Sequence, residues 1–408
     1  MEYDPKKILV LYADAGFGHK SAATAIKAAL EERYEGRCQV EMVNPLDDKR
    51  APFFLRDSQS DYDRIVLKVP ELYKFGYEAS DAEVPGALAE SGLGFLLYDV
   101  MEDLVKRFQP DAIVTTYPVY QSPLNYVFTL TRKRIPLITT VTDLVTVHRL
   151  WFYRGVDLCL VPTPQVGDLA RSYGIPTDAV KVTGIPVHPN VVRETRPARE
   201  IRAELGWDPD LTTILAVGSR RVANLMDSLN VLNHFGAPLQ LAVIAGKDDD
   251  LYQALQAVEW HQKTHLYEFV DNMPVMMHAA DGIMCKAGGL IVTESLACGL
   301  PMMLVDVLPG QEEGNANYVV QGGAANQTLN PLDVMETISH WTMDGGKLMR
   351  ERAENARRLG KPNSAYETAD LVYDLAVNGT TRKPNRLTHR LREFLKTYPH
   401  HFEEKDAE

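Results

Sequence analysis

One stretch of the chain indicates the fold most clearly: Lys286-Ala287-Gly288-Gly289-Leu290-Ile291-Val292-Thr293-Glu294. The residues before it, 282–285, form a short apolar run typical of a buried strand, and the glycine pair then opens a helix. The unpaired N–H groups and positive dipole of a helix N-terminus attract phosphate. Glu294 lies about one turn into this helix, where a carboxylate can accept hydrogen bonds from ribose hydroxyls. The stretch therefore predicts a nucleotide-binding unit of an α/β fold.

A polar loop follows the next predicted strand, at 302–306. Gln311, Glu312 and Asn315 lie close together on this loop, between glycines. Amide and carboxylate groups at this density suit the several hydroxyls of a sugar ring. A plain strand, helix and surface loop without a ligand is the alternative. The ordered set favours a donor site for a sugar nucleotide, built from Gly288, Gly289 and this loop.

Apolar runs alternate with helical patterns along the whole chain, in two series. The first series is 8–13, 39–43, 112–116, 137–141, 158–162 and 180–183, and the second is 212–217, 239–245, 265–269, 282–285 and 302–305. Such alternation predicts an α/β fold with parallel sheets. We therefore expect two Rossmann-like domains that face each other across a cleft, with ligands beyond the carboxyl ends of the strands.

The expected boundaries follow from this alternation. Residues 1–186 form an acceptor-binding domain, completed by a crossover helix at 363–377. A linker at 187–199 precedes a nucleotide-sugar domain at 200–362, and 378–408 form a tail.

Composition restricts the possible functions. The 408 residues suffice for two domains, and the net charge of −12 argues against a nucleic-acid partner. The four cysteines lack metal-ligand spacing, which favours buried thiols in a reducing cytoplasm and no bound metal. The N-terminus does not resemble a signal peptide, and no apolar run is long enough to span a bilayer. We expect a cytoplasmic protein that meets lipid only at the membrane surface.

The first predicted strand ends in Asp14-Ala15-Gly16-Phe17-Gly18-His19, with a helix beginning near Lys20. A histidine at a helix N-terminus is kept neutral by the helix dipole, and a neutral imidazole can act as a general base. His19 is therefore a candidate catalytic base. The alternative is a histidine that merely caps the turn or bonds a carbonyl.

A second polar set follows the strand at 137–141 and contains Asp143, His148 and Trp151. Asp143 would orient His19 or bind an acceptor hydroxyl, and a simple turn aspartate is equally compatible with the sequence.

Two segments suggest contact with lipid. Residues 51–97 are rich in aromatic and aliphatic side chains, which suits either a flap for an apolar acceptor or an ordinary packed helix. In the tail, Leu387, Leu391, Phe394 and Leu395 fall on one helical stripe flanked by basic residues. This pattern predicts an anchor for an anionic membrane, with docking on the first domain or disorder as alternatives.

With these residues in view, the chain resembles the monogalactosyldiacylglycerol synthase and processive diacylglycerol glucosyltransferase family, itself related to the peptidoglycan GlcNAc transferase. The resemblance covers roughly residues 6–377. It rests on Gly16-Phe17-Gly18-His19, Pro70-Glu71-Leu72-Tyr73-Lys74-Phe75, Gln109-Pro110-Asp111, Val141-Thr142-Asp143-Leu144, Phe269-Val270-Asp271-Asn272, Lys286-Ala287-Gly288 and Pro309-Gly310-Gln311-Glu312.

The resemblance implies a GT-B fold and an inverting hexosyltransferase. The donor would be UDP-glucose or UDP-galactose, the acceptor a diacylglycerol-type lipid on the inner face of the membrane, and no metal or other cofactor would be needed. The implied residue roles are His19 as base, Glu294 on the ribose, Gln311 and Glu312 on the sugar, Phe269 and Val270 beside uracil, and Gly18, His148 and Trp151 beside the acceptor.

Two departures from the family pattern concern the diphosphate. The family's glycine cluster is reduced to Gly218, followed by Arg220 and Arg221, and its Gly-Pro-Gly-Thr is replaced by Gly288-Gly289-Leu290-Ile291. Guanidinium groups bind phosphate well and would compensate. Two alternatives stay open: a catalytically silent relative that senses lipid or nucleotide, and a transferase with another acceptor.

Overall fold

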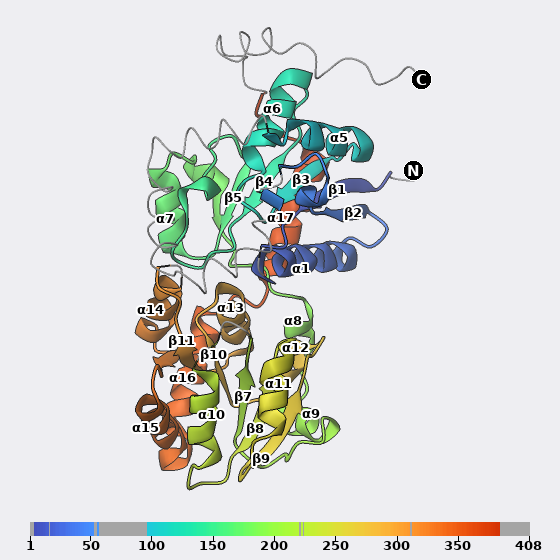
Figure 1. The fold of residues 1–408 in the computed structure, drawn as a ribbon. Helices are drawn as coiled ribbons and strands as arrows, with labels where there is room; N and C mark the ends of the chain where they lie inside the picture. Colours follow the sequence, from blue (N-terminus) through green and yellow to red (C-terminus); the bar gives the residue numbers. More distant parts are fainter. Residues whose placement is uncertain are drawn as a thin grey trace.

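The computed structural model describes residues 4–15, 17–52, 55–56, 96–219, 222, 224–310 and 312–383. These residues form two six-stranded sheets with only parallel strand pairs, each covered by helices (Figure 1). The prediction of an α/β fold with two Rossmann-like, parallel-sheet domains is confirmed. The segment 57–95 and the tail beyond residue 383 lie outside the described residues, as do Gly16, Arg220, Arg221 and Gln311.

The first sheet has the strand order β2-β1-β3-β4-β5-β6. Its strands are β1 (Lys6–Leu11), β2 (Cys38–Val43), β3 (Ala112–Thr115), β4 (Leu137–Thr140), β5 (Leu158–Val161) and β6 (Val180–Val182). Its helices are α1 (Phe17–Arg33), α5 (Tyr98–Phe108), α6 (Gln121–Thr131) and α7 (Pro164–Ser172), with short 3₁₀ turns η1 (Pro45–Asp47), η2 (Arg149–Trp151) and η3 (Thr177–Ala179).

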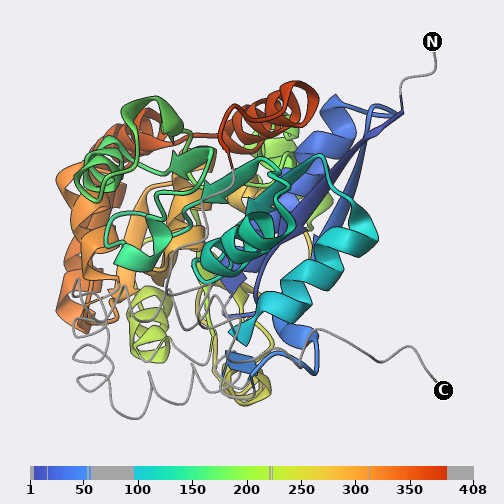
Figure 2. The same cartoon turned by 90° about the horizontal axis from the view of Figure 1, so that it is seen from above.

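Both faces of this sheet are buried, which explains the near-continuous apolar runs of its strands. Alternate residues of β1 point to opposite faces: Leu9 and Leu11 pack with α5, α6 and α7, whereas Ile8 and Val10 pack with α1. A last helix, α17 (Ser364–Asn378), lies beside α1 on this second face (Figure 2). The chain thus returns from the second domain to complete the core of the first.

The second sheet has the order β12-β11-β10-β7-β8-β9. Its strands are β7 (Thr213–Val217), β8 (Gln240–Ile244), β9 (Lys263–Tyr267), β10 (Gly282–Lys286), β11 (Met302–Asp306) and β12 (Ala325–Gln327). Its helices are α8 (Asn190–Arg193), α9 (Ala198–Glu204), α10 (Leu225–Asn233), α11 (Asp249–Gln256), α12 (Met273–Ala279), α13 (Gly289–Cys298), α14 (Glu313–Gln321), α15 (Pro331–Thr342) and α16 (Lys347–Leu359), with η4 (Met343–Gly345).

The domains meet at the carboxyl ends of their strands. Ala22 and Leu144 of the first domain belong to the same apolar cluster as Val292 of α13 and Ala316 of α14. At Gly314, an added Cβ would overlap the hydroxyl of Thr146 across the interface. The loops that follow β4, β10 and β11 are therefore held against one another.

Close backbone packing also shapes the turn after β7. Gly246 follows β8 with φ of +71°, and a Cβ there would overlap the carbonyl oxygen of Gly218. Two glycines from neighbouring strands thus replace side-chain packing at the carboxyl edge of the second sheet.

We expect Gly246→Ala to destabilise the second domain by at least about 2 kcal/mol, since it combines a left-handed backbone with steric overlap. Gly206→Ala tests the backbone alone, because Gly206 has φ of +72° but open space around it in the described structure. Gly236→Ala, with open space and no positive φ, should be nearly neutral. Denaturant unfolding followed by circular dichroism measures the three variants. Equal stability of the Gly246 and Gly236 variants would contradict the packing role.

Candidate active site

The His19 imidazole is held through one nitrogen. Its Nδ1 lies 2.8 Å from the Thr116 carbonyl oxygen and 2.9 Å from Thr142 Oγ1. A carbonyl oxygen only accepts hydrogen bonds, so Nδ1 carries the hydrogen and donates it. In the neutral ring, Nε2 then keeps its lone pair. This is the tautomer that a general base requires.

Burial lowers the pKa of His19 to about 4, against the opposing effect of its hydrogen bond with Thr116. The imidazole is therefore neutral at pH 7. The sequence indicates the same direction of shift from the helix dipole, but the main cause in the structure is desolvation. Helix α1 begins at Phe17, so His19 lies within its first turn.

Aromatic rings surround His19 on two sides. Tyr117 meets it edge-on, with ring centroids 5.0 Å apart, and Trp151 lies at 5.9 Å. Trp151 Nε1 donates a hydrogen bond to Asp143 Oδ2 at 2.7 Å. Burial raises the pKa of Asp143 to about 6, although this hydrogen bond opposes the rise. Among the described residues, the His19 ring is thus hydrogen-bonded to the Thr116 carbonyl and the Thr142 hydroxyl and not to Asp143, which positions the indole.

His148 and Gly18 are the other two residues that the sequence predicts beside the acceptor. His148 is buried, and its Nδ1 accepts a hydrogen bond from the Leu150 backbone N–H at 3.2 Å, capping the turn η2 that presents Trp151. At Gly18, an added Cβ would meet no described atom within 4 Å, so the first turn of α1 leaves open space there. Contact of either residue with an acceptor stays a prediction.

In the second domain, Gly288 is the N-cap of α13 and no described side chain caps this helix. The nearest atom to a Cβ added at Gly289 is the Thr142 carbonyl oxygen, at 3.4 Å. The helix N-terminus therefore lies against the same loop that holds His19. Thr142 brings the two candidate half-sites together.

Glu294 lies in α13, and burial raises its pKa to about 7. Within the part of the chain that the structure describes, no donor forms a hydrogen bond with its carboxylate. A desolvated carboxyl group without a protein partner is suited to a polar ligand.

The loop after β11 is organised by an ion pair. Glu312 Oε1 lies 2.5 Å from Lys286 Nζ, and its Oε2 accepts from the Leu308 N–H at 3.1 Å. Asn315 Nδ2 donates to the Ala287 carbonyl at 3.0 Å. The predicted sugar ligands Glu312 and Asn315 thus also fix the loop around Gly288. Lys286 adds a cation beside the helix N-terminus.

The expected uracil end of the site contains Phe269 and Val270. Phe269 is 44% exposed, whereas Val270 packs on the second-domain core. Lys247 Nζ lies 4.1 Å from the centroid of the Phe269 ring. Gly218 supports this region through its contact with Gly246.

The residues that sequence reasoning overlooked as site members are Thr116, Tyr117, Thr142, Lys247 and Lys286. Three of them carried a usable signal, because Thr116, Thr142 and Lys286 all stand at the carboxyl end of a predicted strand. Among the described residues, no cluster of three or more histidine, cysteine or acidic side chains could hold a metal ion.

Comparison with known proteins agrees with this fold. Residues 216–372 match the glycosyltransferase family 28 C-terminal domain. The crystal structure of Acinetobacter baumannii MurG shares the fold, with a TM-score of 0.57 and 17% identity over 91% of this chain and all of that one. The fold and the matched C-terminal domain define a two-domain glycosyltransferase of the GT-B type.

The first domain identifies the family. Residues 19–187 match the monogalactosyldiacylglycerol synthase model. A probable chloroplastic monogalactosyldiacylglycerol synthase of Glycine max is 33% identical, over 91% of this chain and 71% of the relative. Monogalactosyldiacylglycerol synthase 1 of Arabidopsis thaliana is 30% identical, over 94% and 72%. The chain belongs to the monogalactosyldiacylglycerol synthase family, which confirms the resemblance seen in the sequence.

We expect Glu294→Gln to stabilise the protein at alkaline pH. The folded-state pKa of about 7 exceeds the ordinary value of 4.5, so the folded state binds this proton more tightly and loses stability as pH rises through this interval. Glutamine does not titrate, so the variant should be more stable than the parent by roughly 1–3 kcal/mol at pH 8, and equally stable near pH 4.

Denaturant unfolding at pH 4, 6 and 8 measures this difference. Glu336→Gln on the exposed face of α15 is the matched control and should change stability by less than about 0.5 kcal/mol throughout. A constant difference between parent and Glu294→Gln across the series would show that the carboxyl is not desolvated.

Proposed function

We propose that this protein transfers a hexose from a UDP-sugar to diacylglycerol at a membrane surface, with inversion at the anomeric carbon. The relatives are named as monogalactosyldiacylglycerol synthases, which favours galactose over glucose. The observation that carries the proposal is the neutral His19, whose Nδ1 is hydrogen-bonded and whose Nε2 keeps its lone pair, next to the N-terminus of α13.

The proposed reaction is a single displacement. His19 Nε2 takes the proton of the acceptor hydroxyl as its oxygen attacks the anomeric carbon. The bond from that carbon to the diphosphate oxygen breaks on the opposite face, which inverts the configuration. Negative charge then develops on the departing UDP, where the N–H groups of α13 and the ammonium of Lys286 would stabilise it. Asp143 acts by holding Trp151 against the acceptor side of the base.

The donor would lie along the second domain. Glu294 accepts hydrogen bonds from the ribose, Gln311 and Glu312 contact the sugar, and the backbone at Phe269 and Val270 meets uracil. Arg220 and Arg221 would add to the binding of the diphosphate, in place of the missing glycines. No metal is required in this scheme, because the helix dipole and Lys286 supply the positive charge.

The acceptor reaches the site from a membrane surface. No described helix is long and apolar enough to cross a bilayer. We propose peripheral contact through 51–97 and the basic tail, which favours anionic lipid. The relatives are chloroplast proteins by name.

The function is tested with purified protein, diacylglycerol in vesicles, and separate UDP-galactose, UDP-glucose and UDP-GlcNAc. We expect a monohexosyl lipid, formed fastest with UDP-galactose, with a β-anomeric linkage by NMR, and an unchanged rate in the presence of EDTA. Calorimetry with UDP gives the decisive outcome. If the protein does not bind UDP at millimolar concentration, the proposal is wrong and the protein is a catalytically silent member of the family. Leu290 and Ile291, which stand in the phosphate-binding turn, would then explain the loss of UDP binding.

A second prediction concerns His19 itself. Because loss of a general base typically slows a reaction by about 10²–10⁴-fold, His19→Ala should reduce turnover by that factor while UDP affinity stays unchanged. Steady-state kinetics and calorimetry measure the two quantities. His234→Ala, at an exposed histidine of the second domain, is the control. Turnover within a few-fold of the parent would leave His19 with a capping role only.

A further inference from the structure

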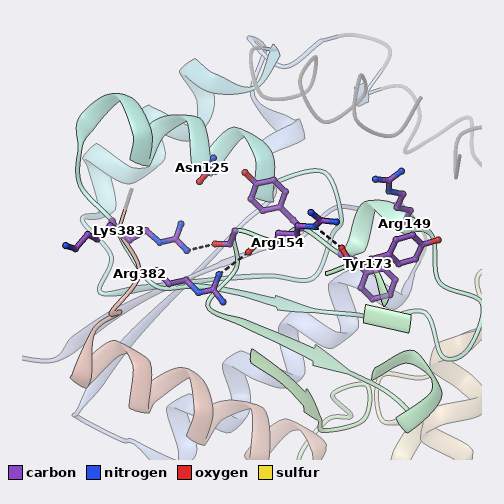
Figure 3. A pocket seen from close by; sticks show the side chains of 10 residues that line it. Asn125, Arg149, Arg154, Tyr173, Arg382 and Lys383 are labelled. Atoms are coloured by element: carbon purple, nitrogen blue, oxygen red, sulfur yellow. Dashed lines mark hydrogen bonds between the residues drawn. The ribbon is translucent and has the colours of Figure 1, made fainter. Parts of the chain in front are cut away.

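A separate cavity of about 560 Å³ lies on the first domain (Figure 3). Arg134 precedes β4 and Gly155 precedes β5, so this cavity is at the amino ends of those strands. The candidate active site is at the carboxyl ends. The cavity is therefore distinct from the proposed donor site, while Arg149 and Phe152 of its wall flank Trp151 in the turn η2.

The cavity wall is strongly basic. Five of the described lining side chains are cationic: Arg134, Arg149, Arg154, Arg382 and Lys383. None of the lining residues that the structure describes is acidic. Arg134 and Arg382 lie 2.6 Å and 3.9 Å from the carboxylate of Asp157, whose side chain is only 5% exposed. Among the described residues of this cavity, positive charge thus exceeds negative charge, on a protein that is acidic overall.

Arg134 is the most buried of these cations, with 6% of its side chain exposed. Its Nη2 donates to the Gly155 carbonyl at 2.5 Å and to Asp157 at 2.6 Å. Its Nε is buried without a hydrogen-bond partner in the described structure. A buried, partly satisfied guanidinium is a group that an anionic oxygen would stabilise.

The neighbouring side chains are fixed in place. Arg154 Nε donates to the Tyr173 carbonyl at 2.9 Å and lies against Gly174, where an added Cβ would be 2.6 Å from that nitrogen. The Tyr173 ring stacks on Phe152, with centroids 5.4 Å apart, and Arg149 lies 5.7 Å from the same ring. The cavity therefore combines positioned cations with an apolar, aromatic side.

The segment after α17 forms another wall, as Figure 3 shows for Arg382 and Lys383. Arg382 Nη1 donates to the Arg154 carbonyl at 3.0 Å, and the Thr380 hydroxyl bonds to Asp157. A ligand here would touch both the body of the domain and its C-terminal segment.

We propose that this cavity binds the phosphate group of an organic phosphate, with the apolar remainder of the ligand against Phe152 and Tyr173. Arginine forks match phosphate oxygens in geometry and charge. The volume suits a small organic molecule. The same chemistry is offered by a soluble phosphate ester and by a phospholipid headgroup, so the source has to be determined by experiment.

The test uses the full chain and two sets of probes. Calorimetry with glycerol 3-phosphate and phenyl phosphate measures soluble ligands, and co-sedimentation compares phosphatidylcholine vesicles with and without phosphatidic acid. The pocket variant is Arg154→Gln/Arg382→Gln. The control, Arg199→Gln/Arg350→Gln, makes the same charge change in the second domain, away from the cavity. Lys383→Gln provides a milder pocket variant if the double variant does not fold.

We expect the pocket variants to weaken phosphate binding, about tenfold or more for the double variant, while the control binds as the parent does. If the pocket variants lose binding of the soluble esters only, the natural ligand is a soluble phosphate ester. If they lose binding to vesicles that contain phosphatidic acid, the natural ligand is a phospholipid headgroup. Saturating UDP should leave the affinity unchanged, because the cavity is outside the proposed donor site. Equal binding by parent, pocket variants and control, or no binding by the parent, would overturn the proposal.

Discussion

Thr142 holds the two halves of the candidate active site in register. Its hydroxyl is 2.9 Å from His19 Nδ1, and its carbonyl oxygen is the closest atom to the missing Cβ of Gly289. One residue of the first domain thus touches both the base and the helix that would carry the donor phosphates. The base and the leaving group are adjacent only when the domains are in contact. A Cβ at residue 289 would lie in ordinary van der Waals contact with this carbonyl, so the two domains are closely packed at this point.

The site is assembled from ionisable groups that the protein desolvates. Burial keeps His19 neutral and raises the pKa of Asp143 to about 6 and of Glu294 to about 7. At neutral pH the raised pKa values of Asp143 and Glu294 cost folding free energy, and a bound ligand can offset this cost. The shift of His19 costs little, because an ordinary imidazole is already mostly neutral at pH 7. Lys286 and Glu312, in contrast, form an ion pair with each other.

The fold and much of the site are readable from the sequence because their signals are local. The α13 turn with Gly288 and Glu294 follows from one strand and one helix, and His19 follows from its position after β1. The partners of His19 are not readable in this way, since Thr116 and Thr142 are 97 and 123 residues distant. Asp143 shows the same limit: its sequence suggests a bond to His19, but the indole of Trp151, eight residues on, is its recorded donor.

The return of the chain to the first domain has a consequence for biosynthesis. Ala365, Ala369 and Val372 of α17 share a buried cluster with Ile8 and Ile26, and Ser364 Oγ accepts a hydrogen bond from the Val187 N–H beside the outgoing linker. The first domain emerges from the ribosome first, yet its core is finished last. During translation, the part of the first sheet that α17 covers stays exposed until the whole second domain has been synthesised. Nascent chains of this protein therefore expose an apolar surface that a ribosome-associated chaperone would have to cover.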